Sequence, residues 1–435
     1  MPAQSPSPEI DATRARIDAA AIAVESKVID WRHHIHANPE LSNREAATAA
    51  FVTEHLRSQG LDEVRTGIAG HGVVGVLHGG IPGDRVMALR ADMDALPVRE
   101  TSGVDFASCV VDNDYPGGPF PVSHACGHDC HTAMLMGAAE VLASVRAELA
   151  GTVLFVFQPA EEGPPVDEDG GAQAMLDAGA LDDPAPTMVF GMHVGPAPKG
   201  VVGYSVGTTY SASVLLKITI TGKQVHGSTP WGGIDPMPVA AEIISATGQI
   251  YRQVPATDPM TISIGHVEDQ GRFNIIGGQV TLWGTIRAVH QRTMDDVRKR
   301  ITRTAEHIAS AYGASAETVF LQAVPSLDNT PAWLDAGLPT LRRVAGESNV
   351  IEIPPQLGYD DVSVFVKKYG GLYPILGVQD VEIVDGQVRP TEGGRGLVVN
   401  HNPAFYADDA TLTTGVRLLT HVAVDHLAGL LEPGQ

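Results

Sequence analysis

The sequence is poor in cysteine, in positive charge and in long apolar runs. It has only three cysteines in 435 residues, too few for a disulfide framework and typical of a reducing compartment. Its 29 basic residues against 51 acidic ones give a net charge of −22, which argues against nucleic acid or an anionic membrane as a partner. No apolar run approaches the length of a membrane span, and residues 1–8 lack the apolar core of a signal peptide. We therefore expect a cytoplasmic protein.

Apolar runs and helical patterns alternate along the first half of the chain and again at its end. This alternation predicts an α/β fold with a mostly parallel mixed sheet flanked by helices. A Gly/Pro-rich stretch at 79–84 joins the first two apolar runs, so we expect these runs to form a hairpin. Strands are predicted at residues 73–77, 86–89, 152–157, 187–192 and 397–399.

The pattern changes between residues 214 and 323. Strands that alternate apolar and polar residues combine with two helical segments in the order βαββαβ, which predicts a ferredoxin-like α+β domain. We therefore predict a first domain in two segments, 1–206 and 324–435, with a second domain at 207–323 inserted between them.

Residues 124–131 read His-Ala-Cys-Gly-His-Asp-Cys-His and hold three imidazoles, two thiols and one carboxylate. On an extended backbone Cys126 and His128 point the same way, and a turn at Gly127 would aim both at one ion. A thiolate and an imidazole suit a borderline metal such as Zn²⁺. The alternative, a polar loop that caps the following helix, accounts poorly for so many ligand-type side chains.

Other acids and imidazoles follow directly after predicted strands. In open α/β sheets, functional sites form beyond the carboxyl ends of the strands. Adjacent glutamates suit a metal hydrolase, because one can bind the ion while its neighbour takes a proton from water. The residues at these strand ends are Asp92, Asp94, Glu161, Glu162, His193 and His401.

Three further histidines lie near the end of a helix predicted over 10–35. His33, His34 and His36 have no carboxylate close by in the sequence. We therefore expect them to pack or cap at the helix end and not to bind metal.

Five segments carry these residues in one order along nearly the whole chain: 89–97, 124–131, 158–163, 191–193 and 401–403. They resemble the M20 metallopeptidases. The closest resemblance is to the amidohydrolase branch, which contains aminoacylase-like, hippurate and indoleacetyl-amino-acid hydrolases. The Ala-Cys-Gly-His-Asp motif is highly specific to that branch.

The resemblance implies a zinc-peptidase-like catalytic domain that binds two divalent ions, Zn²⁺ or Mn²⁺, with Co²⁺ or Ni²⁺ as alternatives. Glu161 would be the general base and acid, and Asp94 would orient a metal ligand. The ligands would be Cys126, His128, Glu162, His193 and His401.

The resemblance also implies that the inserted domain is a lid and the contact surface of a homodimer. His226 would reach the oxyanion of the reaction, and Asn274 and Arg287 would bind the carbonyl or carboxylate of a small, carboxylate-bearing substrate.

The expected activity is hydrolysis of the amide bond of a small N-acyl amino acid or aryl-amide conjugate. Two alternatives stay open. One is hydrolytic removal of an amino group from an activated aromatic ring, and the other is metal-dependent ligand binding without turnover. Two long segments, 106–122 and 379–396, depart from the branch, so the sequence leaves the acyl group and the leaving group undefined.

Overall fold

The computed structural model describes residues 7–433, which form two compact units. The first unit runs to Gly207 and also includes Asp328–Pro354 and the chain from Val364 onward. The second unit comprises Thr208–Leu327 and the short return Pro355–Ser363, which lies outside the predicted insertion. No helix within residues 7–433 is both long and apolar enough to cross a membrane.

The centre of the first unit is a six-stranded sheet with the order β1-β2-β6-β3-β7-β19. The strand β3 pairs in parallel with β6 and with β7, and β7 pairs in parallel with β19, whereas β1, β2 and β6 pair antiparallel. The α/β class with a mixed sheet is thereby confirmed. The strands are β1 (Glu63–Ile68), β2 (Gly72–His78), β3 (Ile81–Asp92), β6 (Ala150–Gln158), β7 (Met188–Phe190) and β19 (Gly371–Leu372).

The predicted hairpin between the first two apolar runs is wrong. The strand β6 lies between β2 and β3 in the sheet, so the two runs are not neighbours. The connecting residues pair with the start of β6: the Gly79 amide donates to the Gly151 carbonyl (2.8 Å) and the Ile81 amide to the Leu149 carbonyl (2.9 Å). The Gly/Pro-rich connection therefore predicts that the chain turns after β2, but it does not predict which strand pairs with β2.

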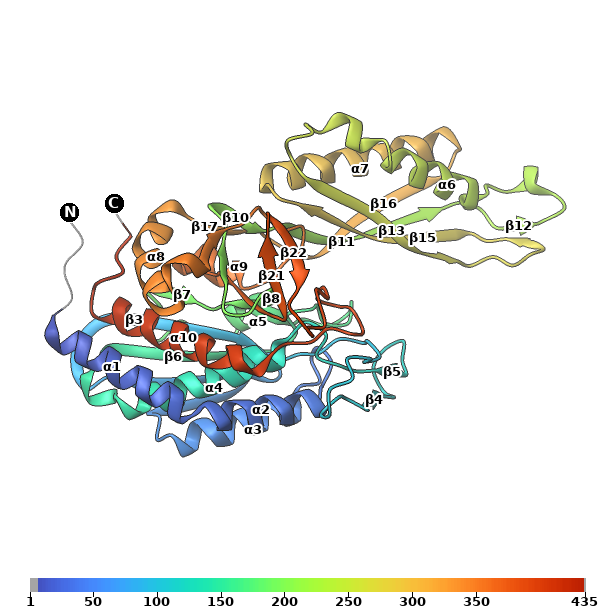
Figure 1. Cartoon of the computed structure of the whole chain (residues 1–435). Coiled ribbons are helices and arrows are strands. Elements are labelled where there is room, and N and C mark those ends of the chain that lie inside the picture. The colour runs from blue at the N-terminus through green and yellow to red at the C-terminus, as the bar shows by residue number, and fades with distance from the viewer. Residues whose placement is uncertain (1–6, 434–435) are drawn as a thin grey trace. The chain divides into compact units, whose positions relative to one another are not determined.

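Two long helices, α4 (His128–Ser144) and α10 (Leu412–Leu427), pack on β3 and β6 (Figure 1). The predicted helix over 10–35 is two helices, α1 (Pro8–Ala23) and α2 (Glu25–Ala37), which meet at Val24. Gly137 in α4 allows the helices to approach closely, because a Cβ there would lie 2.7 Å from the Val28 side chain. The other helices of this unit are α3 (Ala46–Ser58), α5 (Gly171–Asp177), α8 (Pro331–Ala345) and α9 (Ser363–Tyr369).

A second sheet of the first unit has the order β18-β9-β20-β8. Its strands are β8 (His193–Pro198), β9 (Val202–Tyr204), β18 (Val350–Glu352) and β20 (Ile375–Gln379). The strand predicted at 397–399 is absent. The Gln379 side chain instead bonds both backbone groups of Val398, accepting from its amide (2.9 Å) and donating to its carbonyl (2.6 Å). The Gln379 side chain therefore satisfies backbone groups of this apolar run that a neighbouring strand would otherwise bond.

The long segments 106–122 and 379–396 each contain a short antiparallel pair. The first contains β4 (Val111–Asp112) and β5 (Phe120–Pro121), and the second β21 (Val381–Val384) and β22 (Gln387–Pro390).

The second unit has a four-stranded antiparallel sheet with the order β13-β15-β11-β16. The helices α6 (Pro236–Thr247) and α7 (Gln291–Ala311) lie on the same face of it (Figure 1). Even-numbered residues of β11 such as Leu216 and Ile218 face the helices and are buried, as strand alternation requires. The predicted βαββαβ order is therefore present. The strands are β11 (Ala212–Thr221), β13 (Met260–Asp269), β15 (Gln279–Ala288) and β16 (Ser315–Val324), with smaller pieces β12 (Val225–His226) and β14 (Ile275–Ile276). Two short strands, β10 (Gly207–Tyr210) and β17 (Leu327–Asn329), cross the limits of this unit in the sequence.

Candidate metal centre

The loop before α4 places Cys126 and His128 on either side of a left-handed residue. Gly127 has φ 95°, a conformation that favours glycine, and it is the N-cap residue directly before α4. A Cβ at this position would lie 2.3 Å from a Val194 methyl group, so only glycine fits. Cys126 and His128 are both buried.

Three ligand-type side chains from separate elements meet at this loop. The Cys126 thiol, a His128 nitrogen and a His193 nitrogen lie within 4.8 Å of one another. The His193 ring donates from Nδ1 to the Val194 carbonyl (2.7 Å), which leaves Nε2 facing the Cys126 sulfur at 3.4 Å. His193 is therefore oriented by the carbonyl of the next residue to present the lone pair that a cation requires.

A second group shares the same thiol. Cys126, Glu162 and His401 also have ligand atoms within 4.8 Å of one another, and His401 Nε2 lies 3.0 Å from a Glu162 oxygen. His401 has φ 68°, and its amide donates to the Ala125 carbonyl (2.8 Å), which ties this loop to the Cys126 loop. The prediction that His401 follows a strand is wrong, but the residue joins the predicted cluster.

Asp94 and Glu161 flank the imidazole of His128. The His128 Nδ1 lies 2.8 Å from the Asp94 carbonyl and 3.3 Å from the Asp94 carboxylate. The opposite nitrogen, Nε2, lies 3.7 Å from a Glu161 oxygen. Donation from Nδ1 to Asp94 leaves Nε2 available to a cation beside Glu161.

The chemistry of these side chains fits a divalent cation. The His128 Nε2 is buried and has no hydrogen-bond partner among residues 7–433. Burial and the nearby Glu162 and Glu161 carboxylates raise the pKa of Cys126 well above its usual range, and a cation bound beside the sulfur would favour the thiolate. A soft sulfur, imidazole nitrogens and a carboxylate within one buried cluster are the ligand set of zinc and related ions.

A second layer of hydrogen bonds supports the candidate ligands. Asp92 lies 2.6 Å from His131 Nδ1, and His131 Nε2 accepts the Val194 amide (2.8 Å) beside His193. Arg90 donates to Asp92 (2.6 Å) and to Gln158 (2.9 Å). Sequence reasoning noted Asp92 and His131 but gave them no role, because the partner amide is distant in the chain.

His36 joins no group of metal-ligand atoms among residues 7–433, as expected, but the premise that it has no carboxylate partner is wrong. Its two nitrogens lie 2.9 Å from Asp129 and 2.9 Å from Glu100, two carboxylates distant in sequence. Asp129 also accepts from Arg32 Nε (3.0 Å). His36 therefore belongs to a buried ion-pair network around Asp129, the residue that follows His128.

The three predicted substrate-binding residues lie in the second unit. His226 on β12 is paired with Ile275 on β14, directly after Asn274, so the fold brings His226 and Asn274 together. His226 is exposed, and its Nδ1 lies 2.7 Å from the Ser228 hydroxyl. Arg287 lies on β15, with its guanidinium 4.3 Å from the centre of the Tyr359 ring.

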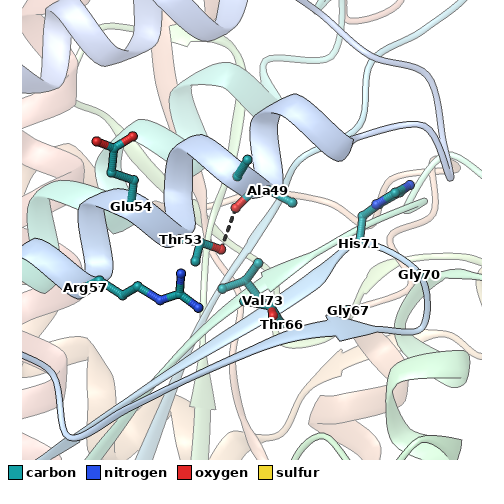
Figure 2. Close-up of a pocket in the computed structure, with 10 residues that line it drawn as sticks. Ala49, Thr53, Glu54, Arg57, Thr66, Gly67, Gly70, His71 and Val73 are labelled. Carbon is teal, nitrogen blue, oxygen red and sulfur yellow. Dashed lines mark hydrogen bonds between the residues drawn. The ribbon is translucent and has the colours of Figure 1, made fainter.

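A surface cavity of about 480 Å³ lies elsewhere in the first unit, between α3 and the β1–β2 turn. Figure 2 shows Arg57 and Glu54 on the helix and His71 near the turn. Exposed side chains of opposite charge line it, and none of the predicted site residues does. The cavity is therefore separate from the candidate metal centre.

The fold and the cluster define an α/β protein with a candidate site for divalent metal ions. The chain matches Peptidase family M20/M25/M40 over residues 88–425 and belongs to this family. It is 36% identical over 396 residues to thermostable carboxypeptidase 2 of Saccharolobus solfataricus, across 90% of this chain and 93% of that protein. It is 37% identical over 310 residues to N-acyl-L-amino acid amidohydrolase of Geobacillus stearothermophilus, across 71% of this chain and 79% of that protein.

The chain is also similar to a solved structure from the same family. The Bacillus subtilis YXEP protein, a dinuclear metal binding peptidase from the M20 family, is 30% identical, with a TM-score of 0.72. The similarity covers 93% of this chain and 99% of that one. The predicted family is confirmed, as is the prediction of a metal-dependent amidohydrolase.

Proposed function

We propose that the chain hydrolyses the amide bond of a small N-acyl amino acid or aryl-amide conjugate at a two-ion centre. The observation that carries the proposal is that two ligand groups share one thiol: Cys126 with His128 and His193, and Cys126 with Glu162 and His401. Two overlapping groups of this kind suit a pair of neighbouring ions better than a single one. The name of the Geobacillus relative supports the substrate class.

The side chains around the cluster divide the chemistry between them. Divalent ions, when bound, acidify water and polarise the carbonyl oxygen of a substrate. Glu161 takes the proton of the attacking water on its carboxylate and then gives it to the departing nitrogen. A C–O bond forms, the C–N bond breaks, and the products are a carboxylate and an amine. Asp94 keeps the His128 ring oriented throughout.

We assign substrate recognition to His226, Asn274 and Arg287 in the second unit. His226 would donate to the developing oxyanion, as an imidazole can when protonated or in the right tautomer. Arg287 would bind a substrate carboxylate, because the guanidinium fork matches its two oxygens. Arg287→Lys should then raise KM for N-acyl amino acids more than it lowers kcat, and an unchanged KM would contradict this assignment.

The decisive experiment compares Glu161→Gln with wild type after metal content has been measured on both. We expect Glu161→Gln to retain the metal and to lose turnover by at least about 100-fold, since general acid–base groups contribute about 10²–10⁴-fold. A matched control is Glu140→Gln on α4, whose carboxylate pairs with Lys27 away from the cluster. Wild-type turnover by Glu161→Gln would contradict the proposed role.

The same preparation distinguishes the alternatives by mass spectrometry of a panel of N-acyl amino acids and aromatic amines. Release of a carboxylic acid and an amine supports amide hydrolysis. Release of ammonia without an acid would indicate deamination, and tight binding without product would indicate a binding protein. Reconstitution with Zn²⁺, Mn²⁺, Co²⁺ or Ni²⁺ identifies the ion that gives activity.

We also propose that the protein is a cytoplasmic homodimer formed through the second unit. The strand β13 is an edge of its sheet, and exposed Ile244, Tyr251 and Val267 lie on α6, on the segment that follows it and on β13. An edge strand with apolar neighbours is a template for pairing with a second chain. Val267→Lys should give a monomer in analytical ultracentrifugation, and an unchanged mass would exclude this surface. The three free cysteines fit a reducing compartment.

A further inference from the structure

The connection between α2 and α3 contacts the loop that carries the two glutamates. Asn43 Nδ2 donates to the Asp169 carbonyl (3.0 Å), and Arg44 pairs with Glu168 (2.7 Å). Ser42 donates to Asp94 (2.7 Å). Three consecutive residues of this connection thus hold either the loop at 160–169 or the carboxylate beside His128.

The fourth residue, Glu45, makes the contact nearest to the chemistry. Its side chain is fully buried, and one oxygen accepts the amides of Ala160 (2.8 Å) and of Asn43 (2.9 Å). Ala160 immediately precedes Glu161 in the chain. The other neighbour of Glu161 is held in a similar way, because the Glu162 amide donates to Asp94 (3.0 Å).

The backbone at Ala160 needs such support. Ala160 has φ 55°, in the left-handed region that a residue with a Cβ rarely adopts. Conformations of this kind persist where the surroundings hold them, and they concentrate at functional sites. The Ala160 amide donates to Glu45, so the carboxyl group of Glu45 holds the strained turn from which Glu161 projects.

We propose that Glu45 is a positioning residue for the general base: by accepting the Ala160 amide, it fixes the turn that aims Glu161 at the substrate. This inference rests on the proposed role of Glu161. Glu45 touches neither the ligand atoms of the cluster nor, on this proposal, the substrate.

The protonation state of Glu45 suggests the conservative variant. Burial and the nearby Asp94 carboxylate raise the pKa of Glu45 to about 8, so the neutral carboxylic acid is favoured at neutral pH. Glutamine resembles that neutral form in size and offers the same carbonyl acceptor to the Ala160 amide. Alanine offers no acceptor at all.

The experiment measures Glu45→Ala, Glu45→Gln and a matched control, Glu40→Ala. Glu40 lies in the same connection and accepts two amides as well, but these are Ala47 (3.0 Å) and Thr48 (2.8 Å) of α3. For Glu45→Ala we expect a fall in kcat of about 100-fold, the effect of a displacement of about 1 Å, with KM and metal content unchanged. Glu45→Gln should restore kcat to within a few-fold of wild type, and Glu40→Ala should lower the Tm without lowering kcat.

Hydrogen exchange gives a readout that does not depend on turnover. In Glu45→Ala the amides of residues 158–163 should exchange faster, whereas in Glu40→Ala they should match wild type. If Glu45→Ala does not fold, Glu45→Asp replaces it, because its shorter side chain keeps the carboxyl group but cannot span the same distance.

The outcomes separate the two proposals. Wild-type kcat and exchange in Glu45→Ala, or an equal fall in kcat in Glu40→Ala, would overturn the positioning role. An active Glu161→Gln would instead refute the base assignment, while the exchange measurement would still show whether Glu45 holds the Ala160 turn.

Discussion

Replacing Arg32 by methionine should destabilise the first unit more than replacing an arginine of a surface ion pair does. Arg32 is 2% exposed, and its Nε donates to Asp129 (3.0 Å), which is 1% exposed. The same guanidinium donates to the Ala407 carbonyl (2.9 Å) and pairs with Asp409. Methionine preserves much of the volume but leaves the Asp129 carboxylate without its principal counter-charge.

The size of the effect follows from burial and from the contact that remains. Removing one partner of a buried ion pair costs about 3–5 kcal/mol, because a buried charge is left uncompensated. His36 Nδ1 still lies 2.9 Å from Asp129, so we expect a loss near the lower end, about 3 kcal/mol. The first unit has about 300 residues, and its unfolding entropy is about 2.1 cal/mol/K per residue, so that loss corresponds to a fall in Tm of roughly 5 °C.

The assay is urea and thermal unfolding of metal-loaded protein, with Arg16→Met as the matched control. Arg16 also pairs with a carboxylate, Glu148, at 2.6 Å, but its side chain is 59% exposed. An exposed pair contributes about 1 kcal/mol or less, so the control should unfold almost like wild type. Equal losses for Arg32→Met and Arg16→Met would refute the reasoning from burial.

Two further perturbations test the packing and the charges of the same unit. Although burial opposes its charge, Asp129 and Glu100 raise the pKa of His36 to about 9, so its stabilising contribution is complete below pH about 6.5 and is lost as the pH rises through about 9. The free energy of unfolding of wild type should therefore approach that of His36→Gln between these pH values, and parallel curves would contradict this. Gly137→Ala should cost about 1–3 kcal/mol in urea unfolding through overlap with Val28, and Val28→Ala in the same chain should recover part of the loss if overlap is the cause.

Sequence patterns predicted well those elements whose pattern also indicates which neighbours they pack against or pair with. The alternation along β11 specifies which face is buried, and the βαββαβ order leaves few ways to form one sheet. The apolar runs that became β2 and β3 carry no such information, since a fully buried strand accepts neighbours on both edges. The residues at 397–399 are apolar yet form a loop, because the Gln379 side chain satisfies the backbone that a neighbouring strand would otherwise bond.

The candidate site likewise contains residues that the sequence predicts and residues that it does not. Cys126 and His128 were predicted as ligands from their residue types and spacing, and the resemblance to the family added Glu162. The residues that hold them, such as Glu45, have ordinary types in ordinary positions, and their role exists only through a contact with an amide distant in the chain. No periodicity or motif reports which backbone amide a buried carboxyl group will accept.

This difference bears on how substrate preference could vary in such a site. The two glutamates of the loop after β6, Asp94 after β3 and the α2–α3 connection are held to one another by short hydrogen bonds. The segment 106–122 touches this framework at its margin, where the Arg44 guanidinium lies 5.3 Å from the centre of the Tyr115 ring. A change at Tyr115 would act on the loop of Glu161 through Arg44 and its pair with Glu168, whereas a change at Glu45 would remove the acceptor of the amide directly before Glu161.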